Sequence, residues 1–149
     1  MRSICISIVA TLALAGTSFA ATINVPGDHA TIQGAIDASS DGDVIAIAAG
    51  TYYESNLNPN GKAITIGSAS GNLDVTIDAQ QGGSVFVIGS GETSGTVIKD
   101  LELTGGTGTA NAGYTFGGGI YCDNSSPTIN GCMITSNTAS NGGGIICLD

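Results

Sequence analysis

The sequence predicts an all-β solenoid, in which short strands stack into parallel sheets, and three observations support this. Glycine makes up 24 of the 149 residues and only 10% of the residues are charged, which suits many short strands joined by tight turns. Apolar residues alternate with polar ones in runs of three or four residues, as in a strand with one buried face. A glycine-rich segment recurs at a spacing of 25 residues, as expected for stacked repeats.

The first 20 residues have the features of a cleavable secretory signal peptide, so the folded domain is expected to span residues 21–149. Arg2 supplies the positive charge, Ile4 to Ala15 is apolar, and Ser18-Phe19-Ala20 is a small-x-small pattern that places the cut after Ala20. The apolar run is too short for a membrane span with these flanks. The sequence therefore predicts a protein that is secreted or held at the cell surface or outer membrane.

Residues 21–43 are expected to cap the N-terminal end of the solenoid. Val25-Pro26-Gly27-Asp28 predicts a turn, and residues 29–39 predict a short amphipathic helix with three apolar residues at helical spacing. These apolar residues are Ile32, Ala35 and Ile36. Either Asp28 or Thr31 is suited to the N-cap position. A solenoid must cover its open end, and a helix here does so.

Residues 44–149 are predicted to form the coils. Asp41-Gly42-Asp43 predicts a turn, and Val44 to Ala48 predicts the first buried strand. Further short alternating runs are Ala63–Ile66, Val75–Asp78, Val85–Val87 and Leu101–Leu103. About three runs per repeat fit a coil that turns and returns, so that successive coils stack at the strand spacing of about 4.8 Å.

Two alignments define the repeat. Gly117 to Cys122 matches Gly142 to Cys147 at an offset of 25 residues, and a second set of apolar residues matches at an offset of 31. The second set pairs Ile98 with Ile129, Leu101 with Cys132, and Leu103 with Ile134. An insertion at residues 107–114 accounts for the longer offset. The first alignment predicts buried ladders of Ile120 with Ile145 and of Cys122 with Cys147.

Three cysteines remain after removal of the signal peptide, and an odd number argues against a closed disulfide framework. Cys122 and Cys147 are expected on adjacent strands, at a distance that permits a disulfide. Their side chains would point the same way, however, which makes the required dihedral angle awkward. We therefore favour free, buried thiols over a bridge, with Cys132 facing the same interior.

Four N-terminal motifs together resemble the opening of the pectin-lyase-like superfamily of right-handed parallel β-helices. They are Val25–Asp28, Thr31–Ala38, Gly42–Ile45 and Gly50–Glu54. Ser126–Cys132 and Gly142–Ile145 are similar to the repeats of exported bacterial β-helix proteins and of polymorphic outer-membrane proteins, although Thr135 stands where the latter usually have Phe. The resemblance implies a right-handed parallel β-helix over residues 22–149. It implies no single function, because one fold carries many activities.

Enzymes of this superfamily provide an alternative interpretation. Its pectate lyases typically use an arginine base with calcium, and its pectin methylesterases pair aspartates with an arginine and glutamines. The chain has no arginine after residue 20, and its one histidine, His29, lies in the predicted cap. We therefore assign no catalytic residue. The alternative is that the chain is the N-terminal part of such an enzyme, with its active-site coils beyond Asp149.

The excess of acidic residues restricts the ligands and partners that this protein could bind, and it makes calcium binding a possibility to consider. Only Lys62 and Lys99 oppose 12 acidic residues after residue 20, a formal charge of about −10, which repels nucleic acid, anionic lipid and polyuronate but attracts divalent cations. Five predicted turn residues carry the oxygen donors that calcium prefers. They are Asp74, Asp78, Asp100, Asp123 and Asn124. We favour solvated surface carboxylates here, so the sequence predicts no metal site and no cofactor.

One apolar stripe is a candidate binding surface. If Val85 and Val87 face the core, strand alternation places three larger side chains on the outside of one sheet. These candidate binding residues are Phe86, Tyr121 and Ile146. Exposed apolar and aromatic side chains suit sugar rings or a protein partner. The favoured alternative is that the insertion carrying Tyr114 and Phe116 folds over them.

The sequence thus predicts an exported, non-catalytic β-helix scaffold, glycan-binding or adhesin-like, whose partners are polysaccharide or other cell-surface components. The chain stops three residues after Ile146, the last residue of the second glycine segment, within a predicted strand. We therefore expect a solenoid truncated at its C-terminus. An open coil edge would allow self-association.

Overall fold

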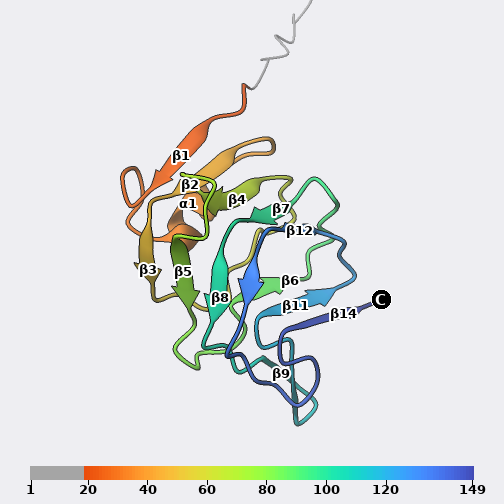
Figure 1. Ribbon diagram of the computed structural model, residues 1–149. Helices are drawn as coiled ribbons and strands as arrows, with labels where there is room; N and C mark the ends of the chain where they lie inside the picture. The colour runs from red at the N-terminus through yellow and green to blue at the C-terminus, as the bar shows by residue number, and fades with distance from the viewer. Residues whose placement is uncertain (1–18) are drawn as a thin grey trace, which may run out of the picture.

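The computed structural model describes residues 19–149, so nearly all of the predicted signal peptide lies outside the described residues (Figure 1). Three parallel sheets make up most of the described chain. The first contains, in order, β1 (Thr22–Val25), β2 (Val44–Ile47), β4 (Thr65–Ser68), β7 (Val97–Lys99) and β12 (Thr128–Asn130). The second contains β3 (Gly50–Tyr52), β5 (Val75–Asp78), β8 (Glu102–Thr104) and β13 (Met133–Ile134). The third contains β6 (Phe86–Ile88), β11 (Ile120–Asp123) and β14 (Ile145–Leu148).

The chain visits these sheets in a fixed cyclic order, and we call one passage through all three a circuit. From β4 onward it passes through the first, second and third sheets three times in succession. Before that, β2 and β3 are followed by Leu57, which forms a parallel bridge to Phe86 of the third sheet. From β2 onward, strands that pair within these three sheets are therefore one circuit apart in the sequence. The predicted all-β fold with parallel sheets is confirmed.

The core lies between the three sheets, and apolar ladders run through it from circuit to circuit. In the first sheet Ile45, Ile66 and Ile98 are in register and fully buried. In the second sheet Ile77 and Leu103 are aligned in the same way. Full burial of such a side chain stabilises the fold by about 1.5–3 kcal/mol.

The register confirms both offsets that the sequence predicts. Ile98 pairs with Ile129 and Leu103 with Ile134, and Ile120 pairs with Ile145. Only one residue of the last pair is buried as predicted. Ile120 is buried, whereas Ile145 is 42% exposed. Within residues 19–149, β14 is the edge strand of the third sheet, so no further strand covers its inner side chains.

The predicted N-terminal helix is confirmed but shorter, since α1 spans Ile32–Ala38. Thr31 is the N-cap, and its hydroxyl accepts a hydrogen bond from the backbone N–H of Gly34 at 3.1 Å. The three apolar residues at helical spacing are all buried. They are Ile32, Ala35 and Ile36.

Two charged side chains of the following segment hold the ends of α1. The carboxylate of Glu54 accepts from the backbone N–H groups of Ile32 (2.7 Å) and Gln33 (3.0 Å). The ammonium of Lys62 donates to the carbonyl oxygen of Ile36 (2.6 Å). Both contacts satisfy backbone groups that a helix end leaves free, with the charge sign that the helix dipole favours.

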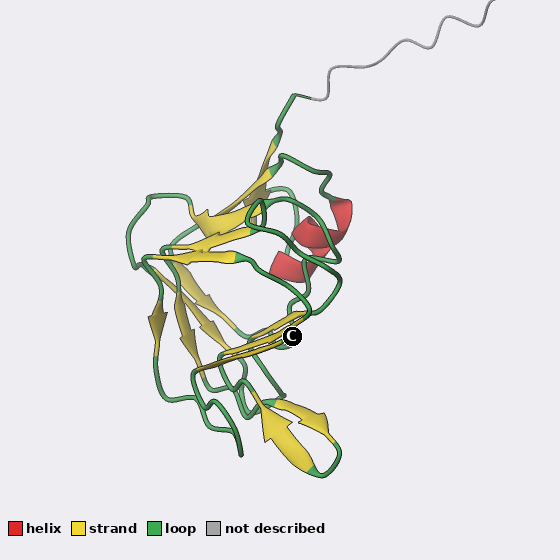
Figure 2. Ribbon diagram, turned by 90° about the vertical axis from the view of Figure 1, so that its right-hand side faces the viewer, coloured by secondary structure: helices red, strands yellow, loops and turns green. Residues whose placement is uncertain are grey.

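The predicted insertion is an antiparallel hairpin formed by β9 (Thr109–Asn111) and β10 (Tyr114–Phe116). It projects beyond the three sheets (Figure 2). It lies between β8 and β11, which is where the 31-residue offset requires additional chain.

The repeated Gly-Gly-Gly segments allow neighbouring circuits to approach closely. A Cβ atom at Gly118 would overlap the carbonyl oxygen of Gly143, and one at Gly119 would lie 2.6 Å from the carbonyl oxygen of Gly144. The backbone N–H of Gly119 instead donates to the Gly144 carbonyl at 2.9 Å. The side chains of other residues would separate these two backbones.

Candidate functional site

The prediction that Phe86 belongs to an exposed apolar stripe on the third sheet is wrong. The register pairs Phe86 with Ile120, and Val87 with Tyr121. Phe86 is therefore an inward residue, and it is fully buried. Its strand has no matching sequence repeat that fixes which residues face the core, and a slip of one residue exchanges the two faces of a strand.

The outward row on this sheet is instead Val87, Tyr121 and Ile146. Tyr121 belongs to this row by register, but only 7% of the residue is exposed, and its hydroxyl donates to Asp123 Oδ2 at 3.3 Å. Burial and the Asp123 charge raise the pKa of Tyr121, whereas a hydrogen bond with Asn111 of β9 lowers it. Asn111 of the hairpin thus lies near the Tyr121 hydroxyl, whereas Tyr114 of the hairpin is 60% exposed. Ile146 is partly exposed, so this sheet presents little apolar surface.

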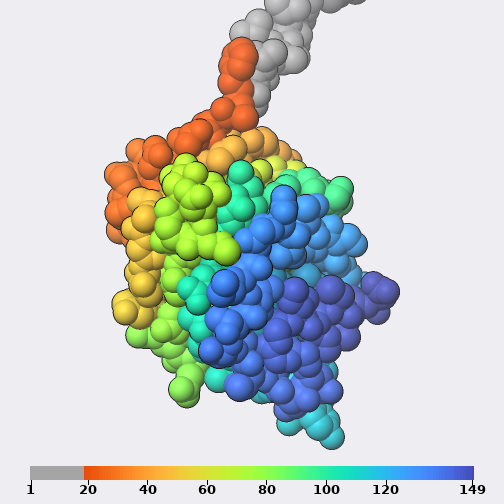
Figure 3. Space-filling model, viewed as in Figure 1, coloured from red at the N-terminus to blue at the C-terminus, as the bar shows by residue number. Residues whose placement is uncertain are grey.

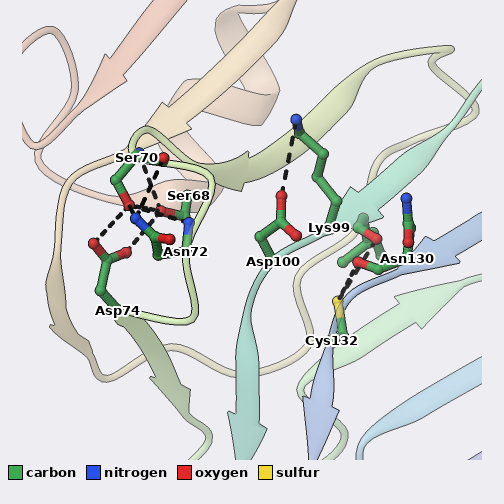
Figure 4. Close-up of polar contacts among 9 residues, drawn as sticks. Ser68, Ser70, Asn72, Asp74, Lys99, Asp100, Asn130 and Cys132 are labelled. Carbon is green, nitrogen blue, oxygen red and sulfur yellow. Dashed lines mark hydrogen bonds and ion pairs between the residues drawn. The ribbon is translucent and has the colours of Figure 1, made fainter.

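The five turn residues considered for calcium do not converge. Asp74 accepts hydrogen bonds from the hydroxyls of Ser68 (2.7 Å) and Ser70 (2.6 Å), whereas Asp100 lies 3.9 Å from the Lys99 ammonium (Figure 4). The others are held locally, Asp78 by the backbone N–H of Gln80 and Asp123 by the amide of Asn124. Among residues 19–149, no three His, Cys, Asp or Glu side chains lie close enough to hold a metal ion.

Glu92 is a buried carboxylate that sequence reasoning missed. Its two oxygens accept from the backbone N–H groups of Gly61 (2.9 Å) and Ser90 (2.8 Å), and from the Ser125 hydroxyl (2.9 Å). Burial alone would raise the pKa of Glu92, but these donors outweigh it, so the pKa is lowered. Because its partners come from three successive circuits, Glu92 joins their turns. No pattern in the sequence distinguishes it from other turn carboxylates.

Other polar side chains also bridge circuits. Asn137 donates to the carbonyl oxygen of Leu103 (2.9 Å) and accepts from the backbone N–H of Gly106 (2.8 Å). Asp41 accepts from the backbone N–H of Ala63, 22 residues away. Both side chains therefore form hydrogen bonds with the backbone of a neighbouring circuit.

The outer face of the second sheet carries a continuous row of exposed and part-exposed side chains. Thr51, Thr76, Glu102 and Met133 are in register across its four strands. The Thr76 hydroxyl donates to Glu102 Oε2 at 2.9 Å. Tyr53 directly follows β3 and is 64% exposed. We call these five residues the second-sheet row.

The strands β3, β5 and β8 lie side by side on the face turned to the viewer in Figure 1, and Figure 3 shows successive segments of the chain crossing that face. The sequence did not reveal the second-sheet row. Strand alternation predicts that Thr76 and Glu102 face outward, and the 31-residue offset places Met133 beside Glu102. Neither of the two sequence alignments includes β3 or β5, so Thr51 and Thr76 were not aligned with the rest of the row.

Comparisons of this chain with protein-family models, with curated proteins and with solved structures found no match. In the described part of the chain, no helix has the length and apolar character needed to cross a membrane.

Proposed function

We propose that this chain is a right-handed parallel β-helix and acts as an exported, non-catalytic scaffold that binds neutral polysaccharide along the second-sheet row. The cyclic order of the three parallel sheets supports the β-helix. Solenoids of this kind present extended surfaces on which long ligands can lie.

The scaffold role is supported by what the polar side chains do. Glu54, Glu92 and Asn137 each accept backbone N–H groups from another circuit or from the capping helix. Their polar atoms therefore stabilise the stack. The lowered pKa of the buried Glu92 keeps its carboxylate ionised and hydrogen-bonded. This is the state that stabilises the stack.

The second-sheet row is the observation that carries the choice of ligand. An exposed tyrosine ring provides a flat apolar surface for a sugar ring, and the Thr51 and Thr76 hydroxyls with the Glu102 carboxylate provide hydrogen-bonding groups for sugar hydroxyls. Repetition at the strand spacing of about 4.8 Å suits an extended chain. The formal charge of −9 disfavours anionic polysaccharides.

Pull-down on insoluble cellulose and chitin, with soluble polygalacturonate as the anionic comparison, tests this function. We expect the wild-type protein to bind a neutral polymer, and both Tyr53→Ser and Glu102→Gln to weaken binding with unchanged melting temperature. Tyr114→Ser is the matched control, because Tyr114 is 60% exposed but lies on the hairpin. Absence of binding to every neutral polymer, or equal loss in the control, would overturn the proposal.

A further inference from the structure

Cys122 and Cys147 form a pair of free thiols that the scaffold role does not use. They are in register on the adjacent parallel strands β11 and β14. Cys122 is buried and Cys147 is exposed. Paired residues on neighbouring strands have Cα atoms about 4.8 Å apart, within the range of about 4.4–6.8 Å that a disulfide requires.

We propose that Cys122 and Cys147 are a reversible redox site, at which a small-molecule disulfide such as oxidised glutathione converts the two thiols into a bond that ties β14 to β11. Cys147 is the entry point because, within residues 19–149, its side chain is the more exposed of the two. Cys132 is a poorer partner, since its thiol is partly buried and donates to the carbonyl oxygens of Asn130 (3.5 Å) and Ile98 (3.6 Å).

The exchange proceeds in two balanced steps. The Cys147 thiolate attacks one sulfur of the small disulfide, which forms a mixed disulfide and releases one thiolate. The Cys122 sulfur then loses its proton and attacks the Cys147 sulfur, which forms the Cys122–Cys147 bond and releases the second thiolate. The protein dithiol loses two electrons and two protons, and the small disulfide becomes two thiols.

The second step is expected to be slow. Burial and the neighbouring Cys147 thiol raise the pKa of Cys122 to about 12, so little thiolate is present near neutral pH. The mixed disulfide on Cys147 should therefore accumulate first and disappear as the bond forms, faster at higher pH.

The bond should also be easily reduced. Side chains on adjacent parallel strands point the same way, so their Cβ atoms stay near the strand spacing, whereas a disulfide prefers about 3.8 Å between Cβ atoms. Closing the bond requires β14 to shift locally. Strained and exposed disulfides have more oxidising potentials and are the labile ones.

Peptide mapping by mass spectrometry after acid quenching and alkylation tests this site on the full-length protein under native conditions. With oxidised glutathione at pH 8 we expect a Cys122–Cys147 linked peptide, its loss on addition of reduced glutathione, and slower amide hydrogen exchange at residues 145–148 in the oxidised form. Cys147→Ser should lose the linked peptide, and Cys132→Ser should keep it.

Three results would overturn the proposal. They are a Cys147 mixed disulfide that persists without resolution at pH 9, a bond between Cys147 and Cys132, or dimers linked only between the Cys147 residues of two chains. Cys147→Ser changes an exposed side chain, and its melting temperature shows whether loss of the linked peptide reflects unfolding.

Discussion

At the residue scale, burial and backbone hydrogen bonds determine what the few charged side chains do. Glu92 and Lys62 illustrate this, because one accepts backbone N–H groups from neighbouring turns and the other donates to the last carbonyls of α1. Neither role can be predicted from the sequence, since each depends on residues about 25 to 33 positions away. Phe86 shows the same limit, because only the pairing of β6 with β11 establishes that it faces inward.

Glu92 gives a prediction of pH dependence. Its pKa lies below the ordinary value of 4.5 in the folded protein, so its contribution to the free energy of unfolding is full above about pH 4.5. That contribution is lost as the pH falls through the folded-state pKa. Lowered pKa values at Asp28, Asp43 and Asp74 act in the same direction.

Urea unfolding of Glu92→Gln at pH 7 and pH 3 measures this contribution. We expect a loss of roughly 1–3 kcal/mol at pH 7, because the amide cannot accept all the donors around it, and a much smaller difference from wild type at pH 3. Glu102→Gln, whose carboxylate is partly exposed and accepts from Thr76, serves as the control. An equal loss for Glu92→Gln at both pH values would contradict the linkage.

At the element scale, local signals in the sequence predicted well where a cap or a repeat marks the structure. Thr31 and the spacing of Ile32, Ala35 and Ile36 predicted α1, and the two Gly-Gly-Gly segments predicted the pairing of β11 with β14. The hairpin of β9 and β10 was predicted only as an insertion. Its strands pair with each other, and no repeated sequence elsewhere in the chain predicts them.

The N-cap of α1 can be tested by Thr31→Ala. This substitution removes the acceptor for the Gly34 N–H and should lower the free energy of unfolding by about 1 kcal/mol, as measured by urea unfolding. Ser40→Ala is the control, since Ser40 is exposed and lies beyond the helix. Equal stability of Thr31→Ala and wild type would show that Glu54 alone suffices to hold this helix end.

The close approach of circuits at the glycine segments gives a further prediction. Gly118→Ala places a methyl group on the Gly143 carbonyl oxygen, so we expect a loss of roughly 1–3 kcal/mol or more from overpacking, seen as a lower urea midpoint. Gly89→Ala is the matched control, because its Cβ atom would lie 3.8 Å from its nearest neighbour. A tolerated Gly118→Ala would mean that the two circuits are further apart than described.

At the scale of the whole molecule, the stability of the fold comes from ladders that repeat between circuits. The sequence predicted the ladder pairs that its two alignments include, as at Ile98 and Ile129, but not the pairing of Ile45 with Ile66 and of Ile66 with Ile98. It did not predict the second-sheet row, because the two alignments leave out β3 and β5, and only the register brings their residues beside Glu102 and Met133. The proposed binding face is therefore a property of the stack rather than of any one segment.

Methyl–methyl nuclear Overhauser effects of Ile98 test the central claim, the stacking of circuits, most directly. In the described register Ile98 lies between Ile66 and Ile129, 32 residues before it and 31 residues after it. We predict that the Ile98 methyl groups show effects to the methyl groups of both residues. Effects to neither residue, with backbone contacts only between consecutive strands as in an antiparallel meander, would contradict the account.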